Sequence, residues 1–504
     1  MMRGALGIIH KPLRTRHKSH TFCELQPSWP KRTTVRLFWN AHKRRNSTEL
    51  NKRLNALVIA IACLLVLPST ALAQLPSPTY GWNLGNTLEP PCGEGCWSPV
   101  ATQAMINSVA AAGFNTIRIP VAWDSHANQT TYQINAAWMA RVKQVVDWSL
   151  AADLTVVINT HWDGGWFENN IGNTVNPTIN AKVNSYWTQI ANNFADYDER
   201  LLFAGANEPN ADTGAEMATL SAYYQTFVNA VRSTGGNNTS RWLVLSGPNT
   251  NIDLTYSLMN TLPSDPTEDR LAVEVHYYDP WQFAGLDADA NWGDMFYFWG
   301  DDYNSSTLAS RNATHSEENH LVAQLQKMNT KFVSQGVPVI LGEFGAMNRT
   351  GNPALTGTNL DLHLASRLYY HQLIVDTANS MGISPIYWDN GWTGQNGSGI
   401  FNRSTAGVFD PDTVSALTGG PGQPGDFDDD GDVDGRDFLE WQRGNSPNPL
   451  SSEDLTDWQT NYGIVPEEVA AIAIPEPTCV AITTLLTLVA VTSRFPQRQK
   501  ILPE

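Results

Sequence analysis

Eight side chains with chemical or binding capacity stand at, or directly after, the ends of short apolar runs in the sequence. They are Arg118, His161, Asn207, Glu208, His276, Tyr278, Glu343 and Trp388. Glu208 and Glu343 are the carboxyl groups of this set, and a carboxyl group can serve as a general acid, a general base or a nucleophile. One such coincidence carries little weight, but it recurs at six of eight runs. The pattern predicts one active site assembled from distant parts of the chain.

The apolar runs themselves predict the elements that position these side chains. They are rich in Val, Ile and Leu, as buried parallel strands are, and they span 80–84, 115–119, 155–160, 201–206, 242–246, 271–276, 337–342 and 384–388. Amphipathic, helical stretches lie between them, for example 136–152, 181–195, 214–234 and 318–335. Eight such units within 75–418 predict an α/β fold, a (β/α)8 TIM barrel, whose active site lies at the C-terminal ends of the strands. The alternative, a doubly wound sheet, lacks a GxGxxG motif after the first strand.

Six short motifs stand at the predicted strands of the same region. They begin with Gly-Trp-Asn-Leu-Gly-Asn-Thr-Leu-Glu at 81–89 and Gly-Phe-Asn-Thr-Ile-Arg-Ile-Pro at 113–120. Asn-Glu-Pro at 207–209, His-Tyr-Tyr at 276–278, Gly-Glu-Phe-Gly at 342–345 and Tyr-Trp-Asp-Asn at 387–390 follow. In sequence and order these motifs resemble the signatures of glycoside hydrolase family 5, especially its cellulase-like endoglucanase branch. One departure is His161-Trp162, where cellulases of the family often carry two adjacent histidines.

The resemblance implies a retaining glycoside hydrolase that needs no cofactor for catalysis, with Glu208 as acid/base and Glu343 as nucleophile. Their carboxyl groups are then expected about 5–5.5 Å apart. Arg118 and Tyr278 are expected to keep Glu343 ionised. Glu208 is expected to have a raised pKa, because it must be protonated before attack.

The remaining site residues have supporting roles in this interpretation. His276 and His161 position the acid and the sugar, Asn207 bonds the sugar 2-hydroxyl, and Trp388 forms a platform under the reacting ring. Structural alternatives remain open at this stage: Arg118 as a core salt bridge, His161 as a core histidine, and Trp388 as core packing.

An aromatic insertion follows the sixth predicted strand, at 279–300. It contains Trp281, Phe283, Trp292, Phe296, Tyr297, Phe298 and Trp299. Such a stretch is as consistent with core packing as with a substrate groove in which rings stack on sugars. Trp162, Trp166 and Trp392 are expected in the same groove.

The predicted substrate is a β-linked, cellulose-like glucan polysaccharide cleaved by endo action. Xyloglucan, mannan and β-1,3/1,6-glucan are the alternatives within the same chemistry. A catalytically inactive surface protein that binds or docks to carbohydrate is the alternative from another class.

A small acidic module is predicted downstream, over 426–463, after the Gly/Pro-rich linker 419–425. Its first twelve residues have the acidic spacing of a calcium-binding EF-hand loop, with candidate ligands Asp426, Asp428, Asp430, Asp432, Asp434 and Asp437. The loop resembles those of dockerins, which implies structural Ca²⁺ and a docking partner. A second copy, 454–463, is preceded by a loop without carboxylates.

Both ends of the chain predict export. Residues 1–73 are a basic leader plus a signal peptide cleaved after Ala73, because an apolar run of about 14 residues is too short for a transmembrane helix. Residues 475–504 begin with Pro-Glu-Pro, followed by an apolar run and Arg494. This resembles a C-terminal sorting signal of exported bacterial proteins, with an ordinary buried helix as the alternative. The protein is therefore expected to be secreted or at the cell surface, and to meet the membrane only through these terminal signals.

Composition agrees with these expectations. The chain of 504 residues has a formal net charge of −17, and its basic residues concentrate at the two ends. Nucleic-acid partners are therefore not expected. In an exported protein Cys92 and Cys96 are expected to form a disulfide, with a metal site as the alternative.

Overall fold

The computed structural model describes residues 80–419, 425, 427, 433–444, 446 and 450–463. The predicted leader, signal peptide and sorting signal lie outside these residues. So do Asp426, Asp428, Asp430 and Asp432 of the predicted calcium loop. Within the described ranges, no helix has the length and apolar character that crossing a membrane requires.

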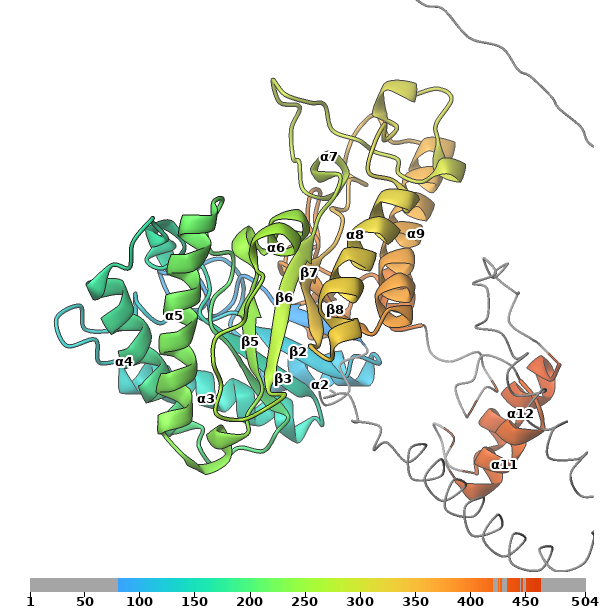
Figure 1. Cartoon of the computed structure of the whole chain (residues 1–504). Helices are drawn as coiled ribbons and strands as arrows, with labels where there is room; N and C mark the ends of the chain where they lie inside the picture. Colours follow the sequence, from blue (N-terminus) through green and yellow to red (C-terminus); the bar gives the residue numbers. More distant parts are fainter. Residues whose placement is uncertain are drawn as a thin grey trace, which may run out of the picture. The chain divides into compact units, whose positions relative to one another are not determined.

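Eight parallel strands close into a barrel in sequence order (Figure 1). They are β1 (Gly81–Leu84), β2 (Thr116–Ile119), β3 (Thr155–Asn159), β4 (Leu201–Ala204), β5 (Leu243–Ser246), β6 (Leu271–Tyr277), β7 (Val339–Phe344) and β8 (Ile383–Asp389). Strand β8 pairs with β1 to complete the ring. The predicted (β/α)8 barrel is confirmed, and each strand lies within two residues of its predicted bounds.

Helices surround the strands (Figure 1). They are α2 (Gln103–Ala111), α3 (Ala136–Ala151), α4 (Pro177–Asn193), α5 (Gly214–Ser233), α6 (Ile252–Leu258), α7 (Trp281–Ala284), α8 (Glu318–Lys331), α9 (Thr358–Ser380) and α10 (Pro411–Thr418). Helix α4 begins earlier than the predicted residue 181 because Asn176 caps it and Pro177 occupies its first turn, the two positions that favour a helix start. Helix α8 ends at Lys331, before the predicted 335, and Val333–Gln335 form a separate 3-10 turn.

Alternation along each strand divides its side chains between two apolar layers. On β6, Val273 and Val275 belong to the large cluster shared with the helices, whereas Ala272 belongs to a separate small cluster. Because successive side chains of a strand point to opposite faces, Glu274 and His276 lie on the same face as Ala272. The barrel interior is therefore apolar at the level of Ala272 and carries charged side chains further along the strand, toward its C-terminal end.

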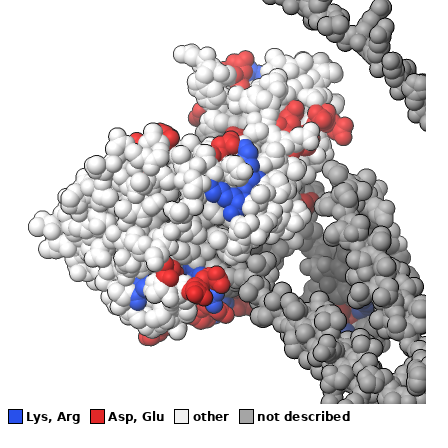
Figure 2. Space-filling model, viewed as in Figure 1, with Lys and Arg blue, Asp and Glu red and all other residues white. Residues whose placement is uncertain are grey.

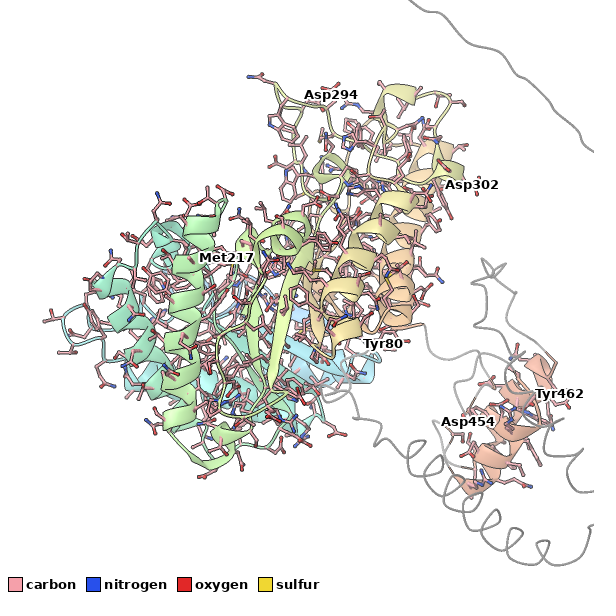
Figure 3. All side chains as sticks on the ribbon, viewed as in Figure 1. Tyr80, Met217, Asp294, Asp302, Asp454 and Tyr462 are labelled. Atoms are coloured by element: carbon pink, nitrogen blue, oxygen red, sulfur yellow. A yellow bond between two sulfur atoms is a disulfide. The ribbon has the colours of Figure 1, made fainter. Side chains whose placement is uncertain are left out.

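The insertion after β6 extends the barrel at one end, where Figure 3 labels Asp294 and Asp302. On the face seen in Figure 2, Lys and Arg gather in small groups interspersed with Asp and Glu. That face therefore presents no continuous basic surface for a phosphate backbone.

The C-terminal module contains the helices α11 (Gly435–Arg443) and α12 (Ser452–Asn461). Phe438 stacks on Trp441 and contacts Trp458, with ring centroids 5.6 and 4.8 Å apart. Helix α11 starts directly after Asp434, whose side chain caps it by accepting from the Arg436 backbone N–H.

Candidate active site

Arg118 organises the upper part of the barrel interior from β2. Its side chain is fully buried, and its terminal nitrogens donate to Asn83 Oδ1 at 3.0 Å, Asn207 Oδ1 at 2.8 Å and Glu343 Oε1 at 2.9 Å. An ion pair with Glu274 Oε1 at 2.9 Å completes the set. Arg118 therefore connects strands β1, β2, β6 and β7 with the loop after β4, and the core salt-bridge alternative describes only part of its contacts.

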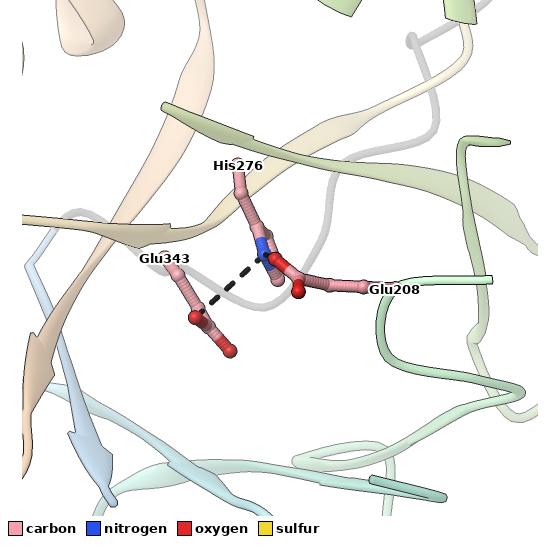
Figure 4. Close-up of side chains that lie close together, drawn as sticks. All are labelled: Glu208, His276 and Glu343. Atoms are coloured by element: carbon pink, nitrogen blue, oxygen red, sulfur yellow. Dashed lines mark hydrogen bonds and ion pairs between the residues drawn. The ribbon is translucent and has the colours of Figure 1, made fainter. Parts of the chain in front are cut away.

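Glu208 and Glu343 flank His276 at the C-terminal end of the barrel (Figure 4). His276 Nδ1 lies 2.8 Å from Glu208 Oε1 and 3.7 Å from Glu343 Oε2. Tyr278 donates its hydroxyl to Glu343 Oε2 at 3.1 Å. Glu343 and His276 are buried, whereas the Glu208 side chain is 45% exposed to the cleft.

The nearest oxygens of the two carboxyl groups are close enough for the shorter of the two separations that glycosidases use. One oxygen from each carboxylate and one nitrogen of His276 all lie within 4.8 Å of one another. Inverting glycosidases hold their carboxyl groups about 6.5–9.5 Å apart, to leave room for a water molecule, and retaining enzymes about 5–5.5 Å apart.

The pKa directions in this site are the reverse of those expected from the sequence. Burial raises the pKa of Glu343, outweighing the opposing charges of His276 and Arg118. Desolvation in the cleft acts to raise the pKa of Glu208 as well, but the hydrogen bond and charge of His276, the charge of Arg118 and a hydrogen bond from Thr250 together outweigh it and hold the pKa below its ordinary value. The two pKa values shift in opposite directions because His276 hydrogen-bonds Glu208, whereas it only approaches Glu343, for which burial prevails.

Glu168, after β3, was not singled out in the sequence. Its Oε1 accepts from Asn207 Nδ2 at 3.1 Å and from the Glu208 backbone N–H at 3.0 Å. Burial raises the pKa of Glu168 to about 7. Glu168 holds the segment that carries Glu208, and nothing in the local sequence distinguishes it from an ordinary loop carboxylate.

The rings of His161 and Trp388 lie parallel to each other in the site. Their ring centroids are 5.8 Å apart and their planes differ by 4°. Burial and the Arg118 cation hold the pKa of His161 well below its usual value, so its ring is neutral. Gly85 makes room for Trp388, because a Cβ there would come within about 3.0 Å of the indole ring. Trp388 is therefore held by packing on one side and lines the cleft with its remaining surface.

A cleft of about 360 Å³ opens above these groups. The eight residues predicted for the active site line it or contact residues that do. Its aromatic walls include Trp162, Trp281 and Trp388. Most of the aromatic insertion is core: Phe283, Phe296, Tyr297, Phe298 and Trp299 are buried.

Exposed tryptophans nevertheless gather around this end of the barrel. Among the described residues, those that keep at least two fifths of their surface exposed all follow barrel strands: Trp97, Trp162, Trp281, Trp292 and Trp392. Trp166, expected in the groove, is buried instead.

The predicted disulfide between Cys92 and Cys96 is present. It lies just before Trp97, whose ring is 6.5 Å from that of Trp162.

Glu274 is the second residue of the site that sequence reasoning missed. It was hidden in an apolar strand, but its position two residues before His276 places both on the interior face of β6. That period-2 spacing is the signal that identifies it.

The sequence matches a known family of enzymes. The cellulase family, glycosyl hydrolase family 5, matches residues 83–394. Endoglucanase A of Paenibacillus barcinonensis is 36% identical over 366 residues, which cover 68% of this chain and 87% of that protein. A xyloglucan-specific endo-β-1,4-glucanase of Bacteroides ovatus is 34% identical over 359 residues, covering 68% of each.

Solved structures give the same result. A family 5 xyloglucan-specific β-1,4-glucanase from a ruminal metagenomic library, in complex with XXLG, is 39% identical with a TM-score of 0.62. The match covers 68% of this chain and 93% of that one. A family 5 xyloglucanase from Paenibacillus pabuli is 35% identical with a TM-score of 0.62, covering 69% and 99%.

Proposed function

The chain belongs to glycosyl hydrolase family 5, and on this premise we propose that Glu343 is the nucleophile and Glu208 the general acid and base of its reaction. The protein is an endo-acting hydrolase of β-glucans that retains the anomeric configuration, as its family does. The observation that carries the residue assignment is the placement of two carboxylates within 4.8 Å at the base of an aromatic cleft.

In the first step, a Glu343 oxygen attacks the anomeric carbon and the glycosidic C–O bond breaks. Glu208 gives its proton to the departing oxygen, and a covalent glycosyl ester forms on Glu343. Arg118 and Tyr278 hold the two Glu343 oxygens, which orients the carboxylate for attack. Asn207, fixed by Arg118 and Glu168, faces the cleft as a partner for the sugar 2-hydroxyl.

In the second step, Glu208 accepts a proton from water while the water oxygen attacks the anomeric carbon. The ester bond to Glu343 breaks, and the sugar leaves with retained configuration. Trp388 lines the cleft as the stacking surface for the reacting ring.

His276 accounts for the change of protonation that the first step demands. In the free site its hydrogen bond favours ionised Glu208, yet Glu208 must be protonated for attack. Its Nδ1 is already 3.7 Å from Glu343 Oε2. A shift of this donor from Glu208 to Glu343 on substrate binding raises the pKa of the acid and lowers that of the nucleophile, which is the order catalysis requires.

Xyloglucan is the proposed preferred substrate. Relatives named as xyloglucan-specific match the chain at 34% and 39% identity. The exposed tryptophans on the loops after the strands, of which Trp162 and Trp281 line the cleft, offer stacking surfaces for several sugar rings of a long chain,.

The test compares xyloglucan, soluble unbranched β-1,4-glucan, mixed-linkage β-glucan and mannan. We expect the highest kcat/KM on xyloglucan, with intermediate-length products appearing first and β-configured at release. Glu343→Gln should lose turnover while still binding oligosaccharide in calorimetry. Hydrolysis by Glu343→Gln at the wild-type rate would contradict the nucleophile assignment, and a higher kcat/KM on mannan would contradict the substrate assignment.

The C-terminal module is proposed to bind structural Ca²⁺ and to dock to a partner, and the terminal segments to direct export. In the described part of the loop, Asp437 is buried and its oxygens accept from the backbone N–H groups of Phe427 and Asp434. Asp437 thus connects the two ends of the twelve-residue loop, and the twelfth residue of a calcium-binding EF-hand loop is likewise a carboxylate. Calcium at 100 times its Kd should stabilise the module by about 2.7 kcal/mol. An unfolding transition that is identical with calcium and with chelator would contradict the site.

A further inference from the structure

Glu274 lies beneath the two proposed catalytic carboxylates and touches neither. Its side chain is fully buried on β6. Its Oε1 accepts from Arg118 Nη2 at 2.9 Å and faces His276 Nε2 at 3.1 Å. Arg118 in turn holds Glu343, and His276 holds Glu208. One buried oxygen thus joins the two cationic groups that contact the reacting pair.

The neighbouring strand, β7, leaves room for the Glu274 side chain at Gly342. A Cβ on Gly342 would come 2.1 Å from Glu274 Oε1, so no larger residue fits there without displacing the carboxylate. The β6–β7 register also slips at this point, where Val275 pairs with Leu341 but His276 pairs with Glu343. The irregularity leaves Gly342 unpaired and brings Glu343 beside His276, and such bulges recur next to active sites.

We propose that Glu274 is a positioning residue that keeps His276 protonated at both nitrogens, with Nδ1–H directed at the catalytic carboxylates, and that couples His276 to Arg118. This inference rests on the proposed function, because it assigns Glu274 a role in the reaction of Glu208 and Glu343.

The geometry explains why a charged donor is needed. With carboxylates at both Nδ1 and Nε2, a neutral ring would offer a proton to only one of them. Desolvation alone would lower the pKa of His276, but the neighbouring carboxylates of Glu343, Glu208 and Glu274 raise it to about 10. Glu208, Glu274 and Glu343 interact with His276 directly, and its charge also acts on His161. The other titratable groups that line a pocket with His276 are Asp253, Tyr277, Tyr278 and Asp279.

A contribution to fold stability does not explain why a buried carboxylate occupies position 274. Its second oxygen, Oε2, is buried and finds no hydrogen-bond partner among the described residues. An unsatisfied buried acceptor destabilises a fold, and a buried ion pair is often replaceable by apolar side chains without loss. The position of Glu274 is therefore better explained by what it does to His276 than by the strength of the barrel.

The first test uses the wild-type protein and no Glu274 variant. Ring ¹⁵N signals of His276, assigned by their loss in His276→Asn, should report a doubly protonated ring at pH 8. A ring that titrates near pH 6.5 would overturn the proposal. The assignment of Glu343 as nucleophile is unaffected by either result, because it is tested by the turnover of Glu343→Gln.

The second test compares Glu274→Gln, which keeps the side chain's shape, with Asp265→Asn as a matched control. Asp265 forms a similarly buried ion pair with Arg232, ahead of β6 and away from the cleft. Glu274→Gln should lower kcat by roughly 10- to 100-fold, with KM changed by less than about threefold and the His276 titration moved to lower pH. Asp265→Asn should change none of these.

Two results would overturn the proposal. The first is a Glu274→Gln variant with the wild-type His276 titration, whatever its activity. The second is an equal loss of kcat in Asp265→Asn. If Glu274→Gln does not fold, Gly342→Ala provides the second variant, because its added Cβ displaces the same carboxylate while leaving its charge in the protein. The same shift of the His276 titration is expected, and its absence contradicts the inference.

Discussion

Buried arginines occupy both ends of the barrel, and the two ends satisfy them in opposite ways. At the C-terminal mouth, Arg118 is surrounded by titratable carboxylates and side-chain amides. At the N-terminal end of the barrel, called the floor below, Arg241 lies just before β5. All five of its N–H groups donate to Asn238 Oδ1 and to backbone carbonyls. The carbonyls belong to Phe194, Tyr197, Asp198 and Leu201.

The difference separates a structural role for the charge of Arg241 from a chemical role for the charge of Arg118. Backbone carbonyls cannot change protonation, so the contacts of Arg241 are the same at every working pH. The partners of Arg118 gain and lose protons and pass that change to one another. Arg118 Nε and Glu274 Oε2 also lack partners among the described residues, whereas Arg241 is fully satisfied. The polar groups beside the reacting carboxylates are therefore less completely hydrogen-bonded than those of Arg241.

The largest effect expected from this comparison is at the mouth. Glu208→Gln removes the proton donor but preserves side-chain shape, so kcat/KM on a glucan should fall by about 10²- to 10⁴-fold. The first step on a glycoside with an acidic aryl leaving group needs less protonation, so kcat/KM on that substrate should fall far less, whereas kcat falls on both because Glu208 is also the base of the second step. Steady-state kinetics on both substrates measure the contrast, and thermal unfolding should be nearly unchanged. Equal losses of kcat/KM on the two substrates would show that Glu208 is not the general acid.

The next effect is at the floor and has the opposite character. Arg241→Met leaves several buried carbonyls without a donor, so the free energy of unfolding should fall by about 3 kcal/mol. Arg241→Lys, which keeps three donors and the charge, should lose less. Denaturant unfolding measures both. The kcat/KM of the folded variants should match the wild type, and a loss of activity in folded protein would break the proposed division between the two ends.

Much of this division follows from the sequence. The eight strands were predictable because parallel barrel strands are continuous apolar runs, and the reactive residues stood at their ends. Glu208, Glu343 and Arg118 could be selected because each follows or ends such a run. The aromatic insertion could not be apportioned, because Trp281 and Trp299 belong to the same kind of stretch and only packing leaves one exposed and the other buried.

The electrostatics of the site escaped prediction for a different reason. The expected pKa order assumed that Arg118 and Tyr278 decide the state of Glu343, yet the direction depends on which carboxylate His276 bonds. That choice is a matter of fractions of an ångström between β4, β6 and β7. Glu274 and Glu168 share this difficulty, because their importance lies in contacts across the barrel that no local motif encodes.

The last effect concerns how the free energy of unfolding depends on pH. His276 has an ordinary pKa of 6.5 when unfolded, and its neighbouring carboxylates, working against desolvation, raise the pKa to about 10 in the folded protein. Between these values the folded state binds more protons than the unfolded state. The stabilisation is complete below about pH 6.5 and is lost as the pH rises toward 10, on the order of 1 kcal/mol per pH unit.

His276→Asn should remove this slope, and Arg241→Met should keep it, even though Arg241→Met lowers stability at every pH. Denaturant unfolding of the three proteins at pH 6, 8 and 9.5 measures the difference. Identical slopes in wild type and His276→Asn would mean that His276 is neutral in the folded barrel, and the contrast between a titrating mouth and an inert floor would then rest on the carboxylates alone.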